Sequence, residues 1–307
     1  MIRKTSPYLD ALLERSEPLC RQFTPVENTE ALFGESRDPL GEERFEAITG
    51  LVHKYANRVL CILTTECAAY CQFCTRQRIV GNDTATEADR RTIDGWAAYI
   101  SAHPDISEII LSGGDPFVAD DEIFAYALKS LAGLPRITVL RIGTRAVVSD
   151  PERVSEPKLT VIRGLDQPVY VGINFEHPDE LTPECIAATR RLREANAILY
   201  SQTVFLKGVN DDYETLRTLF TRLVEIGVRP YYIYRCDAVP GSSRFRAEFH
   251  REREIMTRLR RDLSGLACPT YVIDTPHGSG KIPVPLDFWD FDDSRYRDFE
   301  GDEHEPI

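Results

Sequence analysis

From Arg58 onward, short apolar runs alternate with longer segments in which apolar residues recur at helical spacing. The short runs predict strands and the longer segments predict helices. The predicted strands are Val59–Thr64, Glu108–Leu111, Thr138–Ile142, Val169–Asn174, Leu199–Phe205, Pro230–Tyr234 and Thr270–Ile273. The predicted helices are Glu87–Ala102, Asp121–Leu131, Pro183–Ala195, Tyr213–Gly227 and Glu248–Asp262. This alternation indicates a parallel sheet with helices packed outside it.

Six or seven strand–helix units predict an α/β fold, a partial (β/α)6-type TIM barrel, with functional residues at the carboxyl ends of its strands. Residues 1–55 are expected to form a helical, proline-interrupted lead-in, and residues 56–285 the barrel with its sites. Residues 286–307 are acidic and aromatic, and they predict a C-terminal extension packed on the surface.

Composition narrows the class of protein. The 307 residues are 42% hydrophobic and 28% charged, with a net charge of -12 and 8 cysteines. A net charge of this sign repels polyanions, which argues against nucleic acid as a partner. No apolar run approaches the roughly 20 residues of a membrane span, and no apolar signal core follows the start. A cytoplasmic protein is therefore expected, in which cysteines are ligands or buried thiols rather than disulfides.

Three of the cysteines, Cys67, Cys71 and Cys74, directly follow the first predicted strand. Three thiolates bind three irons of a [4Fe–4S] cluster and leave the fourth iron open, whereas structural clusters and closed zinc sites normally use four protein ligands. This spacing is the signature of the radical S-adenosylmethionine (SAM) superfamily, in which the open iron binds SAM. The alternative is a non-catalytic iron–sulfur or zinc module that borrows Cys61 or a more distant cysteine.

The segment Ser112-Gly113-Gly114-Asp115 follows the second predicted strand. Glycines allow the backbone to approach a ligand closely, and a Ser or Asp oxygen can accept from an ammonium group. Beside the cysteine motif, this segment predicts a site for the amino group of SAM. On its own it would more often be a tight turn.

Several segments in order along residues 50–301 closely resemble the lysine 2,3-aminomutase family, which uses pyridoxal 5′-phosphate (PLP) beside SAM. They are Cys74–Arg78, Leu111–Asp115, Arg141–Arg145, Phe175–Pro178, Gly208–Asp211, Arg229–Tyr234 and Gly278–Lys281. The resemblance implies an isomerase of amino acid metabolism.

Lys281 is the predicted catalytic lysine. It follows a glycine-containing loop, residues 277–280, after the seventh predicted strand. A lysine that exchanges Schiff bases needs mobility, which such a loop supplies. The resemblance implies that Lys281 binds PLP and that Lys54, Tyr55 and Arg58 bind its phosphate and ring. Without the resemblance, Lys281 would be interpreted as a surface lysine on a turn.

The remaining site residues concern the substrate and SAM. The resemblance implies that Arg76 binds the substrate carboxylate, for which bidentate pairing is the expected geometry; an ion pair with an acidic residue is the alternative. Asp237 and Asp274 match two carboxylates that hold the substrate's distal ammonium group. Two carboxylates facing one cavity repel each other unless a cation lies between them, which favours a basic substrate. Gln202 matches a family residue near SAM, and Phe73, also assigned to the SAM site, stands where members of that family have histidine.

The sequence therefore predicts an enzyme that moves the 2-amino group of a basic L-amino acid, lysine favoured, to C3. A 5′-deoxyadenosyl radical would take a hydrogen from the β-carbon and later return it. Arginine as substrate, a protein-bound lysine of a translation factor, and a radical deaminase remain open alternatives. Expected partners are the amino acid and an electron donor such as flavodoxin or ferredoxin, and a homodimer is kept as an option.

Overall fold

The computed structural model describes residues 3–26, 34–81, 85–278, 280–291, 293 and 295–306. Its main feature is a ten-stranded sheet in which the strands follow one another in chain order from β1 to β10. The strands are β1 Glu46–Ile48, β2 Leu51–Tyr55, β3 Arg58–Thr64, β4 Glu108–Gly113, β5 Val139–Thr144, β6 Val169–Asn174, β7 Ile198–Val204, β8 Arg229–Tyr234, β9 Thr270–Asp274 and β10 Lys281–Pro283. Strands β3 to β9 are parallel, and β1, β2 and β10 pair antiparallel at the ends.

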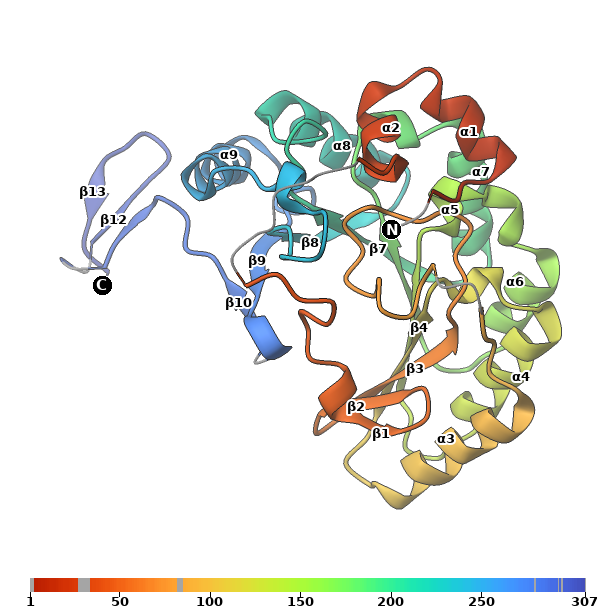
Figure 1. Ribbon diagram of the computed structural model, residues 1–307. Coiled ribbons are helices and arrows are strands. Elements are labelled where there is room, and N and C mark those ends of the chain that lie inside the picture. Colours follow the sequence, from red (N-terminus) through yellow and green to blue (C-terminus); the bar gives the residue numbers. More distant parts are fainter. Residues whose placement is uncertain are drawn as a thin grey trace.

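Helices follow the parallel strands and cover the outer face of the sheet (Figure 1). The helices are α1 Pro7–Leu13, α2 Glu17–Phe23, α3 Arg90–Ala102, α4 Asp121–Ala132, α5 Ala146–Ser149, α6 Glu156–Arg163, α7 Pro183–Glu194, α8 Tyr213–Glu225 and α9 Phe249–Asp262. All predicted strands and helices are confirmed. With six strand–helix units followed by β9, and β1 and β10 as edges in the described residues, the predicted partial barrel is confirmed as well. Helix α6 was not predicted, because two turns show too little periodicity.

The two faces of the parallel strands differ in burial. On β5, Leu140 and Ile142 are fully buried beneath the helices, whereas Arg141 and Gly143 on the opposite face stay partly exposed. Strands β3 and β7 show the same alternation. In a closed barrel the inner residues pack into a solid core. Here alternate residues on the inner face keep partial exposure, so solvent reaches that face, and the space that it borders is called the lumen below. No helix in the described part of the chain is long and apolar enough to cross a membrane.

The predicted lead-in needs a correction. Residues 7–13 and 17–23 are helical as expected, but residues 46–55 form the hairpin β1–β2, which extends the barrel sheet beyond β3. The turn of this hairpin uses Gly50 at a φ of 73°, a conformation that favours glycine. The sheet therefore begins at Glu46 rather than at residue 56, because tertiary pairing with β3 stabilises strands too short to show a pattern.

The C-terminal extension forms a small antiparallel sheet of its own. Its strands are β11 Trp289–Asp290, β12 Arg295–Arg297 and β13 Glu303–His304. An ion pair between Arg253 of α9 and Asp287 anchors its base. The sheet lies to one side of the barrel (Figure 1), and its residues 297–301 line a surface pocket together with residues of α9.

Candidate active site

The three cysteines of the motif lie on the loop after β3, at the carboxyl ends of the strands. Burial raises the pKa of Cys74 to about 11, and the neighbouring Cys71 adds to the rise. Burial likewise raises the pKa of Cys67, and Asp115 and the other two thiols raise it further. These mutual effects place the three thiols within electrostatic reach of one another, and bound irons would offset the repulsion among their ionised forms. The donor set thus fits an iron–sulfur cluster.

The N-terminal helices hold the cysteine loop in place. The backbone N–H of Tyr70 donates to the carbonyl of Lys4 at 3.0 Å, and that of Gln72 donates to the carbonyl of Gln22 at 2.9 Å. Irregular backbone needs such partners when buried. The apolar residues of α1 and α2 pack on the same loop through Leu9, Leu13, Leu19, Phe23 and Ala69. Sequence reasoning assigned these helices no part in the site.

Arg145 connects the loop to the barrel wall. Its Nη1 donates to Cys71 Sγ at 2.7 Å, and its Nη2 donates to Glu180 at 2.9 Å and to Gln22. Burial raises the pKa of Cys71, and the charge of Arg145 opposes that rise. A fixed positive charge therefore lies beside one cluster thiol. The sequence showed Arg145 only as part of a family segment.

The Ser112–Asp115 segment packs directly against the cysteine loop. A side chain at Gly113 would bring its Cβ to 2.1 Å from the Thr64 carbonyl oxygen, and Gly113 also has a φ of 130°. A Cβ at Gly114 would lie 2.2 Å from the Glu66 carbonyl oxygen. The close approach predicted for these glycines is thus present, but it is made to the chain's own backbone.

Asp115 is almost fully buried, and burial raises its pKa. Its carboxylate accepts from the Thr144 hydroxyl at 2.8 Å and from the backbone N–H groups of Arg145, Ala146 and Phe117 at 2.7, 2.8 and 3.0 Å. These bonds tie the ends of β4 and β5 together. A direct contact between Asp115 and SAM stays a prediction.

Gly114→Ala is expected to destabilise the protein by about 1–3 kcal/mol or more, because the new methyl group meets backbone that cannot move aside. Gly95→Ala, in the middle of α3 with open space at its Cβ position, is the matched control. That change is expected to stabilise by about 0.5–1 kcal/mol. Urea unfolding of both variants measures the difference, and an unfolding free energy of Gly114→Ala equal to that of the parent would refute the close packing.

Arg76 already has a carboxylate partner in the structure. Its Nε donates to Glu42 at 3.0 and 3.1 Å and its Nη2 donates at 2.8 Å, while its Nη1 donates to Ser112 Oγ at 2.8 Å. Arg78 also pairs with Glu42. Burial alone would raise the pKa of Glu42, but the two guanidiniums lower it to about 2. Glu42 thus occupies the two guanidinium nitrogens, Nε and Nη2, that a bidentate substrate carboxylate would use. The sequence did not indicate Glu42, because nothing in its local pattern distinguishes it from an acidic residue on the surface.

The two predicted substrate carboxylates lie near each other at the carboxyl ends of two neighbouring strands. Asp274 is the last residue of β9, and Asp237 follows β8. Burial and the charge of Asp274 raise the pKa of Asp237 to about 7. Lys281, paired in register with Asp274 across β9 and β10, donates to both Asp274 oxygens at 2.7 and 2.8 Å. Its ammonium also lies 5.1 Å from the centre of the Tyr234 ring. The structure therefore brings the two acids together with Lys281 as the cation beside them.

The residues predicted for PLP lie where β2 turns into β3, with Lys54 and Tyr55 on β2 and Arg58 on β3. The Lys54 ammonium and the Arg58 guanidinium lie 5.3 and 3.9 Å from the centre of the Tyr55 ring. A Cβ at Gly278 would lie 3.0 Å from Lys54 Nζ, so β2 reaches the segment just before Lys281. These residues, distant in sequence, share one region of the lumen. Ser279 and the side chain of His277 lie outside the described residues.

Gln202 and Phe73 occupy different surroundings. Gln202 on β7 donates to the Tyr234 hydroxyl at 3.2 Å inside the lumen. Phe73 is buried edge-on against Phe245, with 5.6 Å between ring centres, and Arg145 lies 5.6 Å from its ring. A contact of either residue with SAM stays a prediction.

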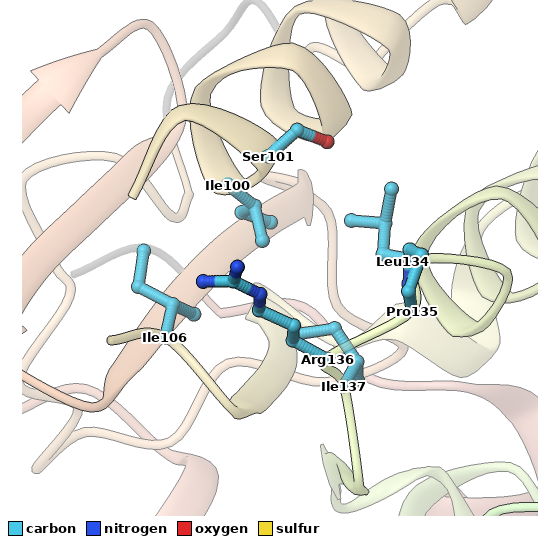
Figure 2. A pocket seen from close by; sticks show the side chains of 7 residues that line it. All are labelled: Ile100, Ser101, Ile106, Leu134, Pro135, Arg136 and Ile137. Atoms are coloured by element: carbon cyan, nitrogen blue, oxygen red, sulfur yellow. The ribbon is translucent and has the colours of Figure 1, made fainter. Parts of the chain in front are cut away.

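A pocket of about 320 Å³ lies away from all these residues, at the amino ends of the strands (Figure 2). It holds none of the predicted site residues. Its lining residues are Ile100, Ser101, Ile106, Leu134, Pro135, Arg136 and Ile137.

Comparison with known proteins shows what the chain is similar to. The model of the radical SAM superfamily matches residues 61–219. The chain is 37% identical over 283 residues to L-lysine 2,3-aminomutase of Acetoanaerobium sticklandii, which covers 91% of this chain and 68% of that protein. It is 33% identical over 250 residues to glutamate 2,3-aminomutase of Clostridioides difficile, which covers 81% of this chain and 59% of that protein. The solved structure of methylornithine synthase aligns over 92% of this chain and 86% of that one, with a TM-score of 0.47 and 14% identity.

The barrel, the cysteine loop and the superfamily match define a radical SAM enzyme, with a [4Fe–4S] cluster and SAM as its cofactors. Within that class, the chain belongs to the lysine 2,3-aminomutase family of isomerases. This sets aside the non-catalytic metal-binding module that the cysteine spacing alone had left open.

Proposed function

We propose that this enzyme is a PLP-dependent aminomutase that moves the 2-amino group of free L-lysine to C3. The observation that carries the proposal is the pair Asp237 and Asp274, two neighbouring carboxylates with a lysine ammonium on one of them. A pair of this kind fits a substrate with a distal cation. The glutamate 2,3-aminomutase relative acts on an amino acid with a distal anion, which the same pair would repel.

In this proposal Cys67, Cys71 and Cys74 hold the cluster. When bound, the cluster and SAM supply a carbon radical, and PLP supplies a ring system that spreads the unpaired electron during amino migration. SAM is assigned to the residues around the cluster, namely Phe73, Ser112, Gly113, Gly114, Asp115 and Gln202. The chain's own residues act by placement, because hydrogen transfer needs near contact between the reacting atoms.

Lys281 has two tasks in the proposed cycle. Its amine would hold PLP covalently, and a nitrogen bound in this way would no longer present the N–H groups that it now donates to Asp274. Asp274 and Asp237 would then be open to the distal ammonium of the substrate, a cation that offsets the repulsion between the two carboxylates.

Arg76 is proposed to bind the substrate carboxylate from the cluster side. Glu42, Ser112 and the Gly113 carbonyl use four of its five N–H groups and fix its orientation. The substrate carboxylate is then met by the remaining N–H of Nη2 rather than by a bidentate grip. Arginine stays the second candidate substrate, since a guanidinium also pairs with two carboxylates.

The deciding experiment is a substrate screen. The cluster is reconstituted anaerobically with PLP, SAM and a reductant, and lysine, arginine and glutamate are each incubated and analysed by chiral mass spectrometry. A β-amino acid of unchanged mass formed from lysine supports the proposal. Formation from arginine would move the assignment to that substrate. Release of 5′-deoxyadenosine with no isomer from any of the three would refute a free amino acid as substrate.

Asp237→Asn and Asp274→Asn are each expected to weaken lysine binding by about 10- to 100-fold, because each removes one charged hydrogen bond to the ammonium group. KM should rise more than kcat falls. The matched control is Asp166→Asn on the loop before β6, which should leave both constants unchanged. An unchanged KM in both site variants would remove the carboxylate pair from substrate binding.

Lysine binding is also expected to depend on pH through Asp237. Its folded pKa of about 7 lies above the usual 3.8, so the carboxyl group holds its proton below neutrality. Because the ammonium binds the ionised form, affinity should rise as the pH rises through 7. Asp237→Asn should lose this dependence, and Asp274→Asn should move it to lower pH by removing the repulsion. Titrations of binding between pH 6 and 8.5 measure it, and a flat profile in the parent enzyme would contradict the assignment.

A further inference from the structure

A second arginine, Arg141, lies in the floor of the lumen and has no assigned role. It is on β5 and points to the inner face, where its side chain is 24% exposed. Its Nε and Nη2 donate to the Tyr200 hydroxyl of β7 at 3.2 and 3.0 Å, and its Nη1 donates to Glu108 of β4 at 2.9 Å. Three strands thus fix one guanidinium in the lumen.

A glycine makes this arrangement possible. Strand β6 lies between β5 and β7, and its Gly172 is the residue beside Tyr200. A Cβ at Gly172 would lie 2.5 Å from the Tyr200 hydroxyl oxygen. The Tyr200 ring therefore lies across β6, where any larger residue would block it, and its hydroxyl reaches Arg141. The position of the guanidinium is set by the fold rather than by a mobile side chain.

The bonds to Tyr200 and Glu108 use three of the five N–H groups of Arg141, so within the described residues one on each Nη stays available. A planar pair of such donors matches the oxygens of a phosphate. The ion pair with Glu108 does not use these two N–H groups, and the Arg141 side chain stays partly exposed to the lumen.

Arg58, one of the residues proposed for PLP, lies next to this arginine. Its partner across β3 and β4 is Glu108, the residue that accepts from Arg141. Burial raises the pKa of Tyr232 to about 12, and the charges of Arg141 and Arg58 oppose that rise. Both guanidiniums therefore lie within electrostatic reach of the same tyrosine. Lys54 shares the Tyr55 ring with Arg58. Glu108 offsets only part of this positive charge, and a dianion would offset the rest.

We propose that Arg141, held by Tyr200 and Glu108, is a further binding residue for the phosphate group of PLP. The proposal rests on the proposed function, because it needs PLP as the ligand. It extends the phosphate site from β2 and β3, which carry Lys54, Tyr55 and Arg58, to Arg141 on the inner face of β5. A phosphate held from two sides fixes the ring relative to the strands, and so relative to Asp274 and the radical source.

The test measures cofactor binding and not turnover. Cluster-loaded protein stripped of PLP is titrated with PLP and, separately, with pyridoxal, which lacks the phosphate. Equilibrium dialysis gives the dissociation constants, and the absorbance that disappears in Lys281→Ala reports the covalent bond. The variants are Arg141→Met, Arg141→Lys and Tyr200→Phe. The control is Arg153→Met, which removes an exposed arginine outside the lumen.

Arg141→Met is expected to bind PLP about 10- to 100-fold more weakly while pyridoxal binding stays within about threefold. Arg141→Lys should recover part of the PLP affinity, and Tyr200→Phe should lose part of it. PLP binding by Arg141→Met equal to the parent would overturn the inference and leave the proposed function standing. Equal weakening for PLP and pyridoxal would overturn it as well, because the loss would then be structural. No Lys281-dependent absorbance in the parent protein would refute both PLP dependence and the inference.

Discussion

Cys71→Ala is expected to abolish SAM cleavage and to leave the reconstituted protein without an intact cluster. The fourth iron of a [4Fe–4S] cluster must stay open for SAM, so each of the three thiolates is needed to hold the other irons. Loss of Cys71 also leaves Arg145 without its sulfur partner beside a buried loop. Iron and sulfide per chain, the spectrum of the reduced cluster and the yield of 5′-deoxyadenosine measure the effect.

The matched control is Cys61→Ala. Cys61 is on β3, only six residues before the motif, but its side chain is fully buried on the helix-facing side of the strand. This variant should keep its iron and its SAM cleavage, at a small cost in stability from the lost packing. Loss of iron in Cys61→Ala to the same extent would show that the ligand set differs from the three cysteines proposed.

Lys281→Ala is expected to eliminate formation of the β-amino acid while SAM cleavage persists. The variant keeps the cluster loop and Arg76 but has no amine to hold PLP. Lys129→Ala, which removes an exposed lysine of α4, is the control and should retain full activity. Chiral mass spectrometry of the products and 5′-deoxyadenosine release separate the two effects. Isomer formation by Lys281→Ala at the parent rate would exclude this lysine as the catalytic residue.

The same variant tests the pairing of Lys281 with Asp274. Without PLP, the parent protein keeps a lysine ammonium on Asp274, whereas Lys281→Ala leaves that carboxylate open. The variant should therefore bind 1,5-diaminopentane more tightly than the parent when PLP is absent, by about tenfold for one charged hydrogen bond. Calorimetric titration of the two proteins without PLP compares their affinities, and equal affinities would contradict the pairing of Lys281 with Asp274.

Features that depend on a short stretch of chain were predictable from the sequence. Alternation of apolar runs and amphipathic segments fixed the strands β3 to β9, because each depends on burying one face of a short segment. The spacing of Cys67, Cys71 and Cys74 placed three thiols on one loop, a consequence of chain geometry over eight residues. The family resemblance then indicated Lys281, Asp237 and Asp274, whose short motifs carry no meaning of their own.

The partners of those residues come from the folded structure and not from local sequence. Glu42 lies on Arg76, Arg145 lies on Cys71, and the N-terminal helices hold the cysteine loop, each across a separation that no local pattern records. The hairpin β1–β2 exists because β3 offers an edge to pair with, which intrinsic preference does not show. The meeting of Arg141 with Tyr200 depends on a glycine in the strand between them. Side chains on strands far apart in sequence become neighbours only when the sheet curves, so the chemistry of the lumen is a property of the fold.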